Sequence, residues 1–524
     1  MCGIAGTSER APSSEMEAKV KKMLEILGHR GPDACGIHSE GKVSMGNTLL
    51  KITGDMPQPL RGEYGTLVLN GEIYNFREIA KNLGLRTLSD TETLLRLIET
   101  ERGNRTENSG EKPGKEPGTD PETPGLNAVS AALSQVNGDY ALAYLSGDEL
   151  VLARDPLGVK PLFCSLREGG EMGEGEERED IEEAGEKDLG PELFFASEKK
   201  ALRAFGVNPF PLPPGTVLSF NLKTGKTREK SLKIQFPTLR ISDELEASAA
   251  LRKALEKAVS LRLSPGCGIA FSGGIDSAVV AALAGKIKRG IRLYAVGLPD
   301  SHDLAQAEFA ARALGLEASL VTHVLSPEEI EAAVPHVIKA VESTDPMKIS
   351  IGLPLYIIAK HAREDGVKVL LTGQGSDELL AGYRRHETFL EAGREVLDRE
   401  IYLDLCKISE LNLERDDMVT MASGVELRVP FLDPGVVKVG LAISPELKVR
   451  KTAGAYSRKH ILRKAAEALL SPELALKEKK AMQYGTGVQK VLDKLARDAG
   501  FSRKEGNHIE KYLTRVAGVN EILH

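Results

Sequence analysis

Strand-like and helix-like segments alternate between residues 244 and 371, and this alternation restricts the possible fold more than any other feature. The first helix of the series is predicted at Glu244–Leu261. Apolar strands are predicted at Gly268–Phe271, Leu293–Val296, Ser319–His323 and Lys368–Leu371, with helices at Asp276–Ala284, Leu304–Leu314 and Leu353–Glu364. Strands connected through helices pair in parallel, so we expect an α/β doubly wound parallel sheet. The remainder, about 375–524, is predicted to be a mostly helical tail.

Residues 1–205 have a different pattern of predicted elements, with many short strands and few helices. Strands are predicted at Cys2–Gly6, Leu67–Leu69, Tyr140–Leu145, Glu149–Ala153, Leu162–Ser165 and Leu193–Ala196. Helical periodicity occurs at Ser14–Leu27, Phe76–Leu83, Thr91–Glu99 and Ala128–Gln135. This mixture predicts packed sheets with flanking helices, an α+β layered fold.

A chain of 524 residues is too long for one hydrophobic core, so two or three domains are expected. We predict an N-terminal domain at 1–205, a hairpin and linker at 206–241 and a C-terminal domain at 242–524. Two segments interrupt the first domain. Residues 103–125 hold four prolines and five glycines, and residues 167–190 hold eleven acidic and three basic residues. Both are predicted to be flexible surface insertions.

The acidic insertion accounts for the net charge of −7, since it carries −8 and leaves +1 for the rest. A nearly neutral body gives no electrostatic indication of nucleic-acid binding. The five cysteines are far apart and form no Cys-x-x-Cys pair, which argues against a disulfide framework or a zinc site built from them. No apolar run approaches the ~20 residues of a membrane span, and no secretory signal is visible, so a cytoplasmic protein is expected.

The chain starts Met1-Cys2-Gly3-Ile4-Ala5-Gly6. Removal of Met1 would expose a cysteine whose thiol and α-amine share one residue. An α-amine titrates near pH ~8 and can accept a proton, so Cys2 is a candidate N-terminal nucleophile. A small apolar residue in a first β-strand is the alternative.

A predicted strand ends in Ser272-Gly273-Gly274-Ile275-Asp276-Ser277, where a helix starts. Glycines allow successive N–H groups to face one point, and a helix N-terminus adds partial positive charge, so this loop suits a phosphate. It lacks the lysine of a Walker loop. A second strand ends in Thr372-Gly373-Gln374-Gly375-Ser376-Asp377-Glu378. If the strands are neighbours, Asp276 and Asp377 would converge on Mg²⁺, which indicates a Mg-nucleotide site. Ordinary strand-to-helix turns are the alternative.

Several longer strings resemble known families. Met1–Ile4, Arg30–Asp33, Leu69–Asn75 and Ala153–Gly158 resemble class II glutamine amidotransferases, which have an N-terminal-nucleophile fold. The loops at Ser272–Ser277 and Thr372–Glu378, with Arg428–Asp433, resemble the ATP-pyrophosphatase synthetase half of glutamine-hydrolysing asparagine synthetase. The order of the two halves is similar to that family over nearly the whole chain.

The resemblance implies that Cys2 attacks the side-chain amide of glutamine and releases ammonia. Asn70 and Gly71 would form the oxyanion hole, and Glu72 and Asp90 would hold the α-ammonium of glutamine. From the residues alone, Asn70-Gly71 could also be a hairpin turn, and Asp90 could cap the following helix.

In the second half, the resemblance implies that aspartate attacks the α-phosphate of ATP to give β-aspartyl-AMP, from which ammonia, delivered through the interior, displaces AMP. Asp276 and Asp377 would bind Mg²⁺, and Lys480 would neutralise the reacting phosphate unless it belongs to a solvated face. ATP, glutamine and aspartate are the expected partners, and a homodimer is possible. The residues implied around the nucleotide are Ala270, Val296, Thr372 and Gly373, with Ser272, Gly273, Gly274 and Ser277 around pyrophosphate.

Three positions depart from the family pattern. Thr48 stands where the family commonly has an arginine for the carboxylate of glutamine, and Lys51 is the nearest cation. Gln374 stands where many members have glutamate, and Ser350 where an arginine near the phosphates is common. These changes leave open a different carboxylate acceptor, or an ammonia-dependent ligase with weak glutaminase activity. A regulatory binder with a decayed ligase half also stays open, whereas the loop at Ser272–Ser277 argues against a glutaminase fused to an isomerase or phosphoribosyltransferase.

Overall fold

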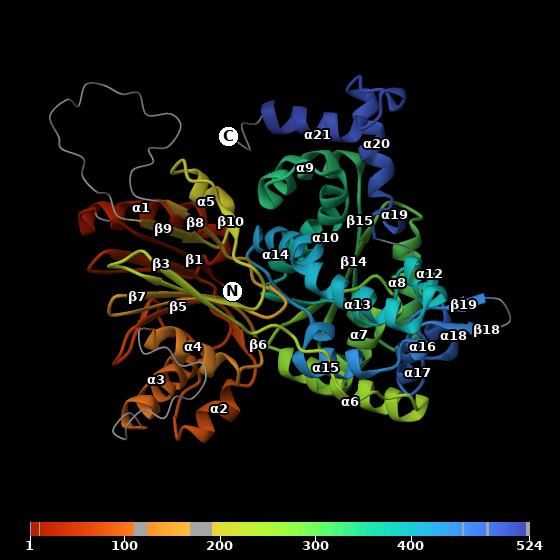
Figure 1. The fold of residues 1–524 in the computed structure, drawn as a ribbon. Helices are drawn as coiled ribbons and strands as arrows, with labels where there is room; N and C mark the ends of the chain where they lie inside the picture. The colour runs from red at the N-terminus through yellow and green to blue at the C-terminus, as the bar shows by residue number, and fades with distance from the viewer. Residues whose placement is uncertain are drawn as a thin grey trace. The chain divides into compact units, whose positions relative to one another are not determined.

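The computed structural model describes residues 2–9, 11–108, 123–167, 191–452, 455–477 and 482–519. They divide into two compact units, Met1–Ile234 and Gln235–His524. Each is described separately (Figure 1). Among the described residues, no helix combines the length and apolar character that crossing a bilayer requires.

The first unit contains two six-stranded sheets in the orders β10-β8-β9-β1-β3-β2 and β12-β11-β7-β6-β5-β4. The strands of this unit are β1 Gly3–Ser8, β2 Ala34–Glu40, β3 Val43–Leu49, β4 Leu60–Arg61, β5 Thr66–Ile73, β6 Gly138–Ser146, β7 Glu149–Arg154, β8 Phe163–Arg167, β9 Glu192–Ala196, β10 Phe210–Pro211, β11 Thr216–Asn221 and β12 Thr227–Ser231. All of the paired strands run antiparallel.

Helices cover the outer faces of both sheets, which gives four layers (Figure 1). Helices α1 and α5 pack on the first sheet, while α3 and α4 pack on the second and α2 packs against α3. Their bounds are α1 Ser13–Ile26, α2 Phe76–Asn82, α3 Asp90–Asn108, α4 Pro124–Leu133 and α5 Lys199–Arg203. One apolar core, which includes Ile4, Val68 and Phe195, draws residues from both sheets. The predicted α+β layered architecture is confirmed.

Part of the predicted insertion 103–125 is helical, because α3 extends to Asn108 and α4 begins at Pro124. The start of α4 is held by Glu149, whose carboxylate accepts hydrogen bonds from the N–H groups of Gly125 (2.7 Å) and Leu126 (2.9 Å). A carboxylate at a helix N-terminus also interacts favourably with the positive end of the helix dipole. Residues 109–122 and 168–190 lie outside the described part, so the predicted flexibility of both insertions stays a prediction.

The second unit is built on a five-stranded parallel sheet in the order β15-β14-β13-β16-β17. Its strands are β13 Gly268–Ala270, β14 Arg292–Gly297, β15 Leu320–Val324, β16 Val369–Leu371 and β17 Glu426–Arg428. From β13 the chain adds β14 and β15 on one side, and β16 and β17 follow on the other side. The two loops that leave β13 and β16 therefore lie side by side at this switch point, where doubly wound sheets bind ligands. The predicted parallel doubly wound sheet is confirmed.

Most of the remaining second unit is helical, as predicted, with one short hairpin of β18 Arg450–Thr452 and β19 Ala455–Ser457. The helices are α6 Glu244–Arg262, α7 Ile275–Ile287, α8 His302–Ala313, α9 Pro327–Val341, α10 Pro346–Glu364, α11 Ser376–Leu379, α12 Arg385–Ala392, α13 Arg394–Ile408, α14 Glu414–Met421, α15 Pro434–Ala442, α16 Pro445–Lys448, α17 His460–Ala466, α18 Pro472–Leu476, α19 Met482–Gly485, α20 Val488–Asp498 and α21 His508–Val519.

Candidate functional site

Cys2 lies immediately before β1 and is buried, with 4% of its surface exposed. Its backbone nitrogen donates a hydrogen bond to Asn70 Oδ1 (3.2 Å), and its carbonyl accepts one from Arg30 Nε (3.2 Å). Arg30 is fully buried and also donates to Glu198 Oε1 (2.8 Å). Burial acts to raise the pKa of Glu198, but its contacts with His29, Lys200 and Arg30 outweigh burial and hold that pKa well below its ordinary value. The backbone around the thiol is therefore held by a charged, buried network.

Asn70 and Gly71 lie within β5, paired with Ala141 and Tyr140 of β6. The hairpin-turn alternative is therefore wrong, since both residues are in the middle of a paired strand. A Cβ at Gly71 would lie 2.2 Å from the carbonyl oxygen of Asp139, so only glycine fits there. The close approach of β5 to β6 thus explains the glycine without any appeal to a turn.

Asp90 is buried and is the first residue of α3. Its Oδ2 accepts a hydrogen bond from the N–H of Ile73 (3.1 Å), while the N–H of Glu92 bonds to Ser89 Oγ (3.2 Å). Ser89 therefore supplies the cap that was one alternative for Asp90. Asp90 and Glu72 both line a small cavity together with Cys2; its walls comprise Cys2, Leu49, Leu50, Lys51, Ile52, Thr53, Gly54, Met56, Gln58, Gly71, Glu72, Ser89, Asp90 and Thr91.

This cavity measures about 30 Å³, which is room for roughly two water molecules. Thr48 is not among the lining residues, because its hydroxyl accepts from the N–H of Gly3 (3.0 Å) and donates to the carbonyl of Leu27 (3.3 Å). Lys51 lines the cavity and is exposed. The structure thus brings together the predicted residues Cys2, Gly71, Glu72, Asp90 and Lys51, and turns Thr48 toward the backbone of β1.

In the second unit, the loop after β13 makes the turn expected of a phosphate-binding loop. Gly273 has φ of 68°, and a Cβ there would lie 2.4 Å from the carbonyl oxygen of Gln306. Gly274 is the N-cap of α7, and Ser277 Oγ donates to its carbonyl oxygen (3.1 Å). The loop after β16 approaches closely, since a Cβ on Gly373 would lie 2.5 Å from the Cβ of Asp276. The two glycine-rich loops are therefore neighbours.

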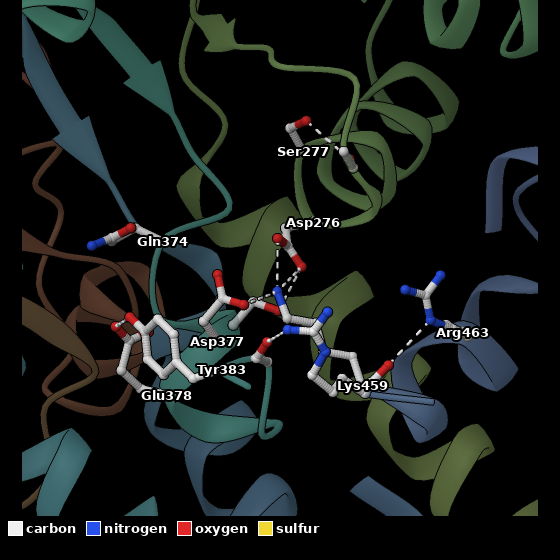
Figure 2. Close-up of polar contacts among 12 residues, drawn as sticks. Asp276, Ser277, Gln374, Asp377, Glu378, Tyr383, Lys459 and Arg463 are labelled. Carbon is white, nitrogen blue, oxygen red and sulfur yellow. Dashed lines mark hydrogen bonds and ion pairs between the residues drawn. The ribbon is translucent and has the colours of Figure 1, made fainter. Parts of the chain in front are cut away.

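The carboxylates of Asp276 and Asp377 converge, as predicted, but on the ammonium group of Lys459 (Figure 2). Lys459 Nζ lies 2.8 Å from both carboxylate oxygens of Asp276 and 2.7 Å from Asp377 Oδ1. Ser376 Oγ also donates to Asp276 Oδ1 (2.8 Å). Asp276 and Lys459 are buried, and Lys459 has a positive φ of 51°. This ion cluster lies at the ends of β13 and β16.

A cavity of about 710 Å³ opens over the cluster. The predicted residues that line it are Ala270, Ser272, Asp276, Ser277, Val296, Thr372, Gly373, Gln374 and Asp377. Gly273 and Gly274 form the adjoining turn and are not among its lining residues. Lys480 lies outside the described residues, so its role stays a prediction.

A further carboxylate in this cavity, that of Glu378, was not predicted as a site residue from the sequence. Glu378 accepts hydrogen bonds from the hydroxyl of Tyr383 and from Asn412 Nδ2 (2.6 Å). Burial, with the negative charge of Asp377, raises the pKa of Glu378 to about 6. Burial and Glu378 itself raise the pKa of Tyr383 far above its ordinary value, so the phenol stays protonated and donates.

Comparison with known proteins agrees with this geometry. The family described as "Asparagine synthase" matches residues 250–395 and 387–517, and the family described as "Glutamine amidotransferase domain" matches residues 1–109. A protein of Methanocaldococcus jannaschii, provisionally named glutamine-hydrolysing asparagine synthetase 1, is 33% identical over 98% of this chain and 99% of its own length. This chain belongs to the glutamine-hydrolysing asparagine synthetase family.

Other family members match over most of their length. Asparagine synthetase B of Escherichia coli (strain K12) is 28% identical over 93% of this chain and 83% of its own. The asparagine synthetase of Sandersonia aurantiaca is 30% identical over 90% of this chain and 84% of its own. Two of the residues that depart from the family pattern, Gln374 and Ser350, lie in the described part of the chain. Ser350 is buried, and its hydroxyl donates to the carbonyl of Met347 (3.2 Å). The amide of Gln374 points away from Lys459 (Figure 2).

Lys459 is the main residue that sequence reasoning missed. Its partner Asp276 is 183 residues away in the chain, so no local pattern reveals the pair. It stands in Ser457-Arg458-Lys459-His460, one of several basic stretches near the C-terminus. The buried, short contacts to two carboxylates single it out only in the folded chain.

Proposed function

We propose that this chain is an ATP-dependent amide ligase that converts aspartate to asparagine with nitrogen taken from glutamine. The observation that carries the proposal is the cavity at the ends of β13 and β16, where Asp276, Asp377 and Lys459 meet beside a phosphate-type turn. The names of the relatives support the same activity. ATP use and free, scattered cysteines suit a cytoplasmic enzyme.

In the first unit, Cys2 would attack the glutamine side-chain amide once Met1 is removed. The nitrogen that donates to Asn70 Oδ1 would then be the α-amine, held in a fixed position to accept the thiol proton. Gly71 N–H and the Asn70 amide are the proposed oxyanion donors, each worth about 10²–10³ in rate. Glu72 and Asp90 supply two carboxylates for the ammonium group of the substrate.

In the second unit, aspartate would attack the α-phosphate of ATP and release pyrophosphate, giving β-aspartyl-AMP. The carboxylates of Asp276 and Asp377 suit Mg²⁺, which prefers one or two carboxylates together with substrate phosphates. When bound, that ion would neutralise phosphate charge. The ammonium of Lys459 lies between the same carboxylates, at the edge of the cavity proposed to hold the phosphates of ATP. We propose that it offsets the charge that develops on them.

Attack of ammonia on the acyl-adenylate breaks the acyl–phosphate bond, expels AMP and releases one proton. Gln374 cannot accept a proton, whereas Glu378 faces the same cavity with a pKa of about 6. We propose Glu378 as the proton acceptor, with Tyr383 and Asn412 fixing its carboxylate. The ammonia would come from the first unit without release to solvent, since ammonia in water is mostly ammonium.

The decisive assay supplies ATP, Mg²⁺, glutamine and aspartate and measures pyrophosphate and asparagine in equal amounts. Formation of neither product would overturn the proposed function. Gln374 favours one second candidate, the same chemistry on a different carboxylate acceptor. That candidate predicts that another acid, and not aspartate, supports pyrophosphate release. A homodimer remains part of the proposal and is tested by mass measurement in solution.

A further inference from the structure

Three side chains with metal-binding groups converge at the edge of the parallel sheet, and none of them is among the residues that line the catalytic cavity. His323 belongs to the edge strand β15, Glu329 to the first turn of α9 and His361 to the last turn of α10. Their ligand atoms all lie within 4.8 Å of one another. All three side chains are partly buried, with 29–33% exposed, so an ion could reach them from solvent.

The distances fit a tetrahedral metal. Two ligand atoms about 2.0 Å from a tetrahedral Zn²⁺ lie about 3.3 Å apart. Here His323 Nε2 lies 2.9 Å from both oxygens of Glu329, and His361 Nε2 lies 3.7 Å from Glu329 Oε1. The two imidazole rings have centroids 3.9 Å apart. The contacts of Glu329 with the two histidines therefore differ from that spacing by a few tenths of an ångström, and the two rings would have to tilt apart for both nitrogens to reach one ion.

The hydrogen-bonding state of His361 also points to a ligand. Its Nδ1 lies 3.0 Å from Glu364 Oε2, which favours the proton on Nδ1. The Nε2 atom is then left with a lone pair directed into the cluster, and this atom is buried without a hydrogen-bond partner. A carboxylate behind the second ring nitrogen is the usual arrangement around metal-bound histidine, because it fixes the ring and raises its basicity.

We propose that His323, Glu329 and His361 bind one Zn²⁺, with Glu364 orienting His361 and water in the fourth position. Two imidazoles and a carboxylate are a donor set that suits zinc, unlike the all-oxygen set of Asp276 and Asp377. The ion joins β15, α9 and α10, and α10 also carries Met347, Ile351 and Leu355 of the catalytic cavity wall. The site therefore stabilises the second unit, and its existence does not depend on the proposed function.

The test uses the full chain, stripped with a chelator and kept in excess Mg²⁺ so that Asp276 and Asp377 do not compete. We expect one Zn²⁺ per chain, a rise in the thermal midpoint on zinc addition, and the strong visible absorption of tetrahedral Co²⁺ after cobalt substitution. His361→Gln and His323→Gln should each abolish all three effects. Glu364→Gln should weaken zinc binding about tenfold.

His336→Gln is the matched control, because His336 is an exposed histidine on α9 outside the cluster. It should bind zinc as the wild type does, and all variants keep the five cysteines. Equal zinc binding in the wild type and in His361→Gln would overturn the proposal. If zinc has no effect on the wild type and His361→Gln is nevertheless destabilised, the cluster contributes through ion pairing alone. The cobalt spectrum of the wild type decides the question even if a variant fails to fold.

Discussion

Lys459 shows how one residue joins two predicted loops into a site. Asp276 and Asp377 were placed together from the sequence because parallel strands end at one edge of a sheet. The cation between them could not be placed, because it arrives from a segment that follows the hairpin β18–β19 and carries many other basic residues. Glu378 was overlooked for a related reason, since its significance lies in burial and in its contacts to Tyr383 and Asn412.

Replacement of Lys459 by methionine should reduce both stability and synthesis. Loss of the ammonium leaves Asp276 buried and without this cation, a change that costs about 3 kcal/mol of unfolding free energy for a buried pair. Mg²⁺ should restore part of the stability if the two carboxylates bind it. Chemical denaturation with and without Mg²⁺, and pyrophosphate release, are the measurements.

Lys477→Met is the matched control, since Lys477 lines the same cavity but is exposed and contacts the ring of Phe309. It should change stability little. Equal destabilisation in the two variants, or no recovery with Mg²⁺ in Lys459→Met, would contradict the assignment.

If Glu378 is the proton acceptor, its pKa sets the pH dependence of asparagine synthesis. A proton acceptor with a pKa of about 6 loses activity as the pH falls below 6. The folded pKa lies above the ordinary 4.5, so this group stabilises the fold below pH 4.5, and that contribution is lost as the pH rises through 6. Acidification thus does not unfold the protein through Glu378, and the activity loss reports its protonation.

The measurement is the ratio of wild-type to Glu378→Gln activity between pH 5 and 8. The ratio should fall toward acid pH, because only the wild type loses a base. Gln374→Glu in the Glu378→Gln background should recover part of the activity by returning a carboxylate to the cavity. A ratio that stays constant with pH would assign Glu378 a structural role.

At the scale of elements, the sequence predicted ten strands (β1, β5–β9 and β13–β16) and eight helices (α1–α4, α6–α8 and α10), whereas α9 was missed and the helices after residue 375 were predicted only as a mostly helical tail. The missed strands have physical explanations. Strand β2 consists largely of small and polar residues without alternation, and it is held by backbone pairing to β3. Strand β3 has apolar residues at Val43, Met45 and Leu49, but Gly46, Asn47 and Thr48 interrupt the pattern. Strand β17 contains Glu426 and Arg428, which bind each other at 2.6 Å in the interior, so its sequence does not read as a buried strand. Pairing across long sequence distances decides such elements.

The close pairing of β5 with β6 at Gly71 predicts that Gly71→Ala disturbs the site in the first unit. The added Cβ would lie 2.2 Å from the Asp139 carbonyl, so the strands must separate locally, at a cost of about 1–3 kcal/mol. The proposed oxyanion hole would be displaced, and glutaminase activity should fall far more than ammonia-dependent synthesis. Gly28→Ala is the control, because a Cβ there meets nothing within 4 Å. Similar glutaminase loss in both variants would count against a role for the β5–β6 spacing.

At the scale of the whole molecule, the chain carries two units with separate candidate sites, and the described residues that line each site belong to one unit. The first has Cys2, the proposed nucleophile, beside a small cavity, and the second has the larger cavity proposed to bind ATP and an acid. The sequence predicted the two separate activities because each unit carries short contiguous sequence motifs. It could not predict how glutamine is held, since Thr48 is turned away and the cavity at Cys2 is narrow.

Cys2→Ala separates the two activities. We expect it to abolish glutamine-dependent synthesis, since the described residues that line the first cavity include no second thiol, and to leave ammonia-dependent synthesis intact. In the wild type, intact mass should show that Met1 has been removed. Equal loss of both activities in Cys2→Ala would refute two separate sites.

The same pair of proteins tests how ammonia is transferred. With unlabelled glutamine and ¹⁵N-ammonium in the medium, asparagine from the wild type should contain less ¹⁵N than the free ammonium pool. The deficit should grow as glutamine is raised, because nitrogen that stays within the protein does not mix with solvent. Cys2→Ala provides the fully labelled reference, since its nitrogen can come only from the medium. Wild-type asparagine with the isotopic composition of the pool at every glutamine concentration would show that ammonia is released before it is used.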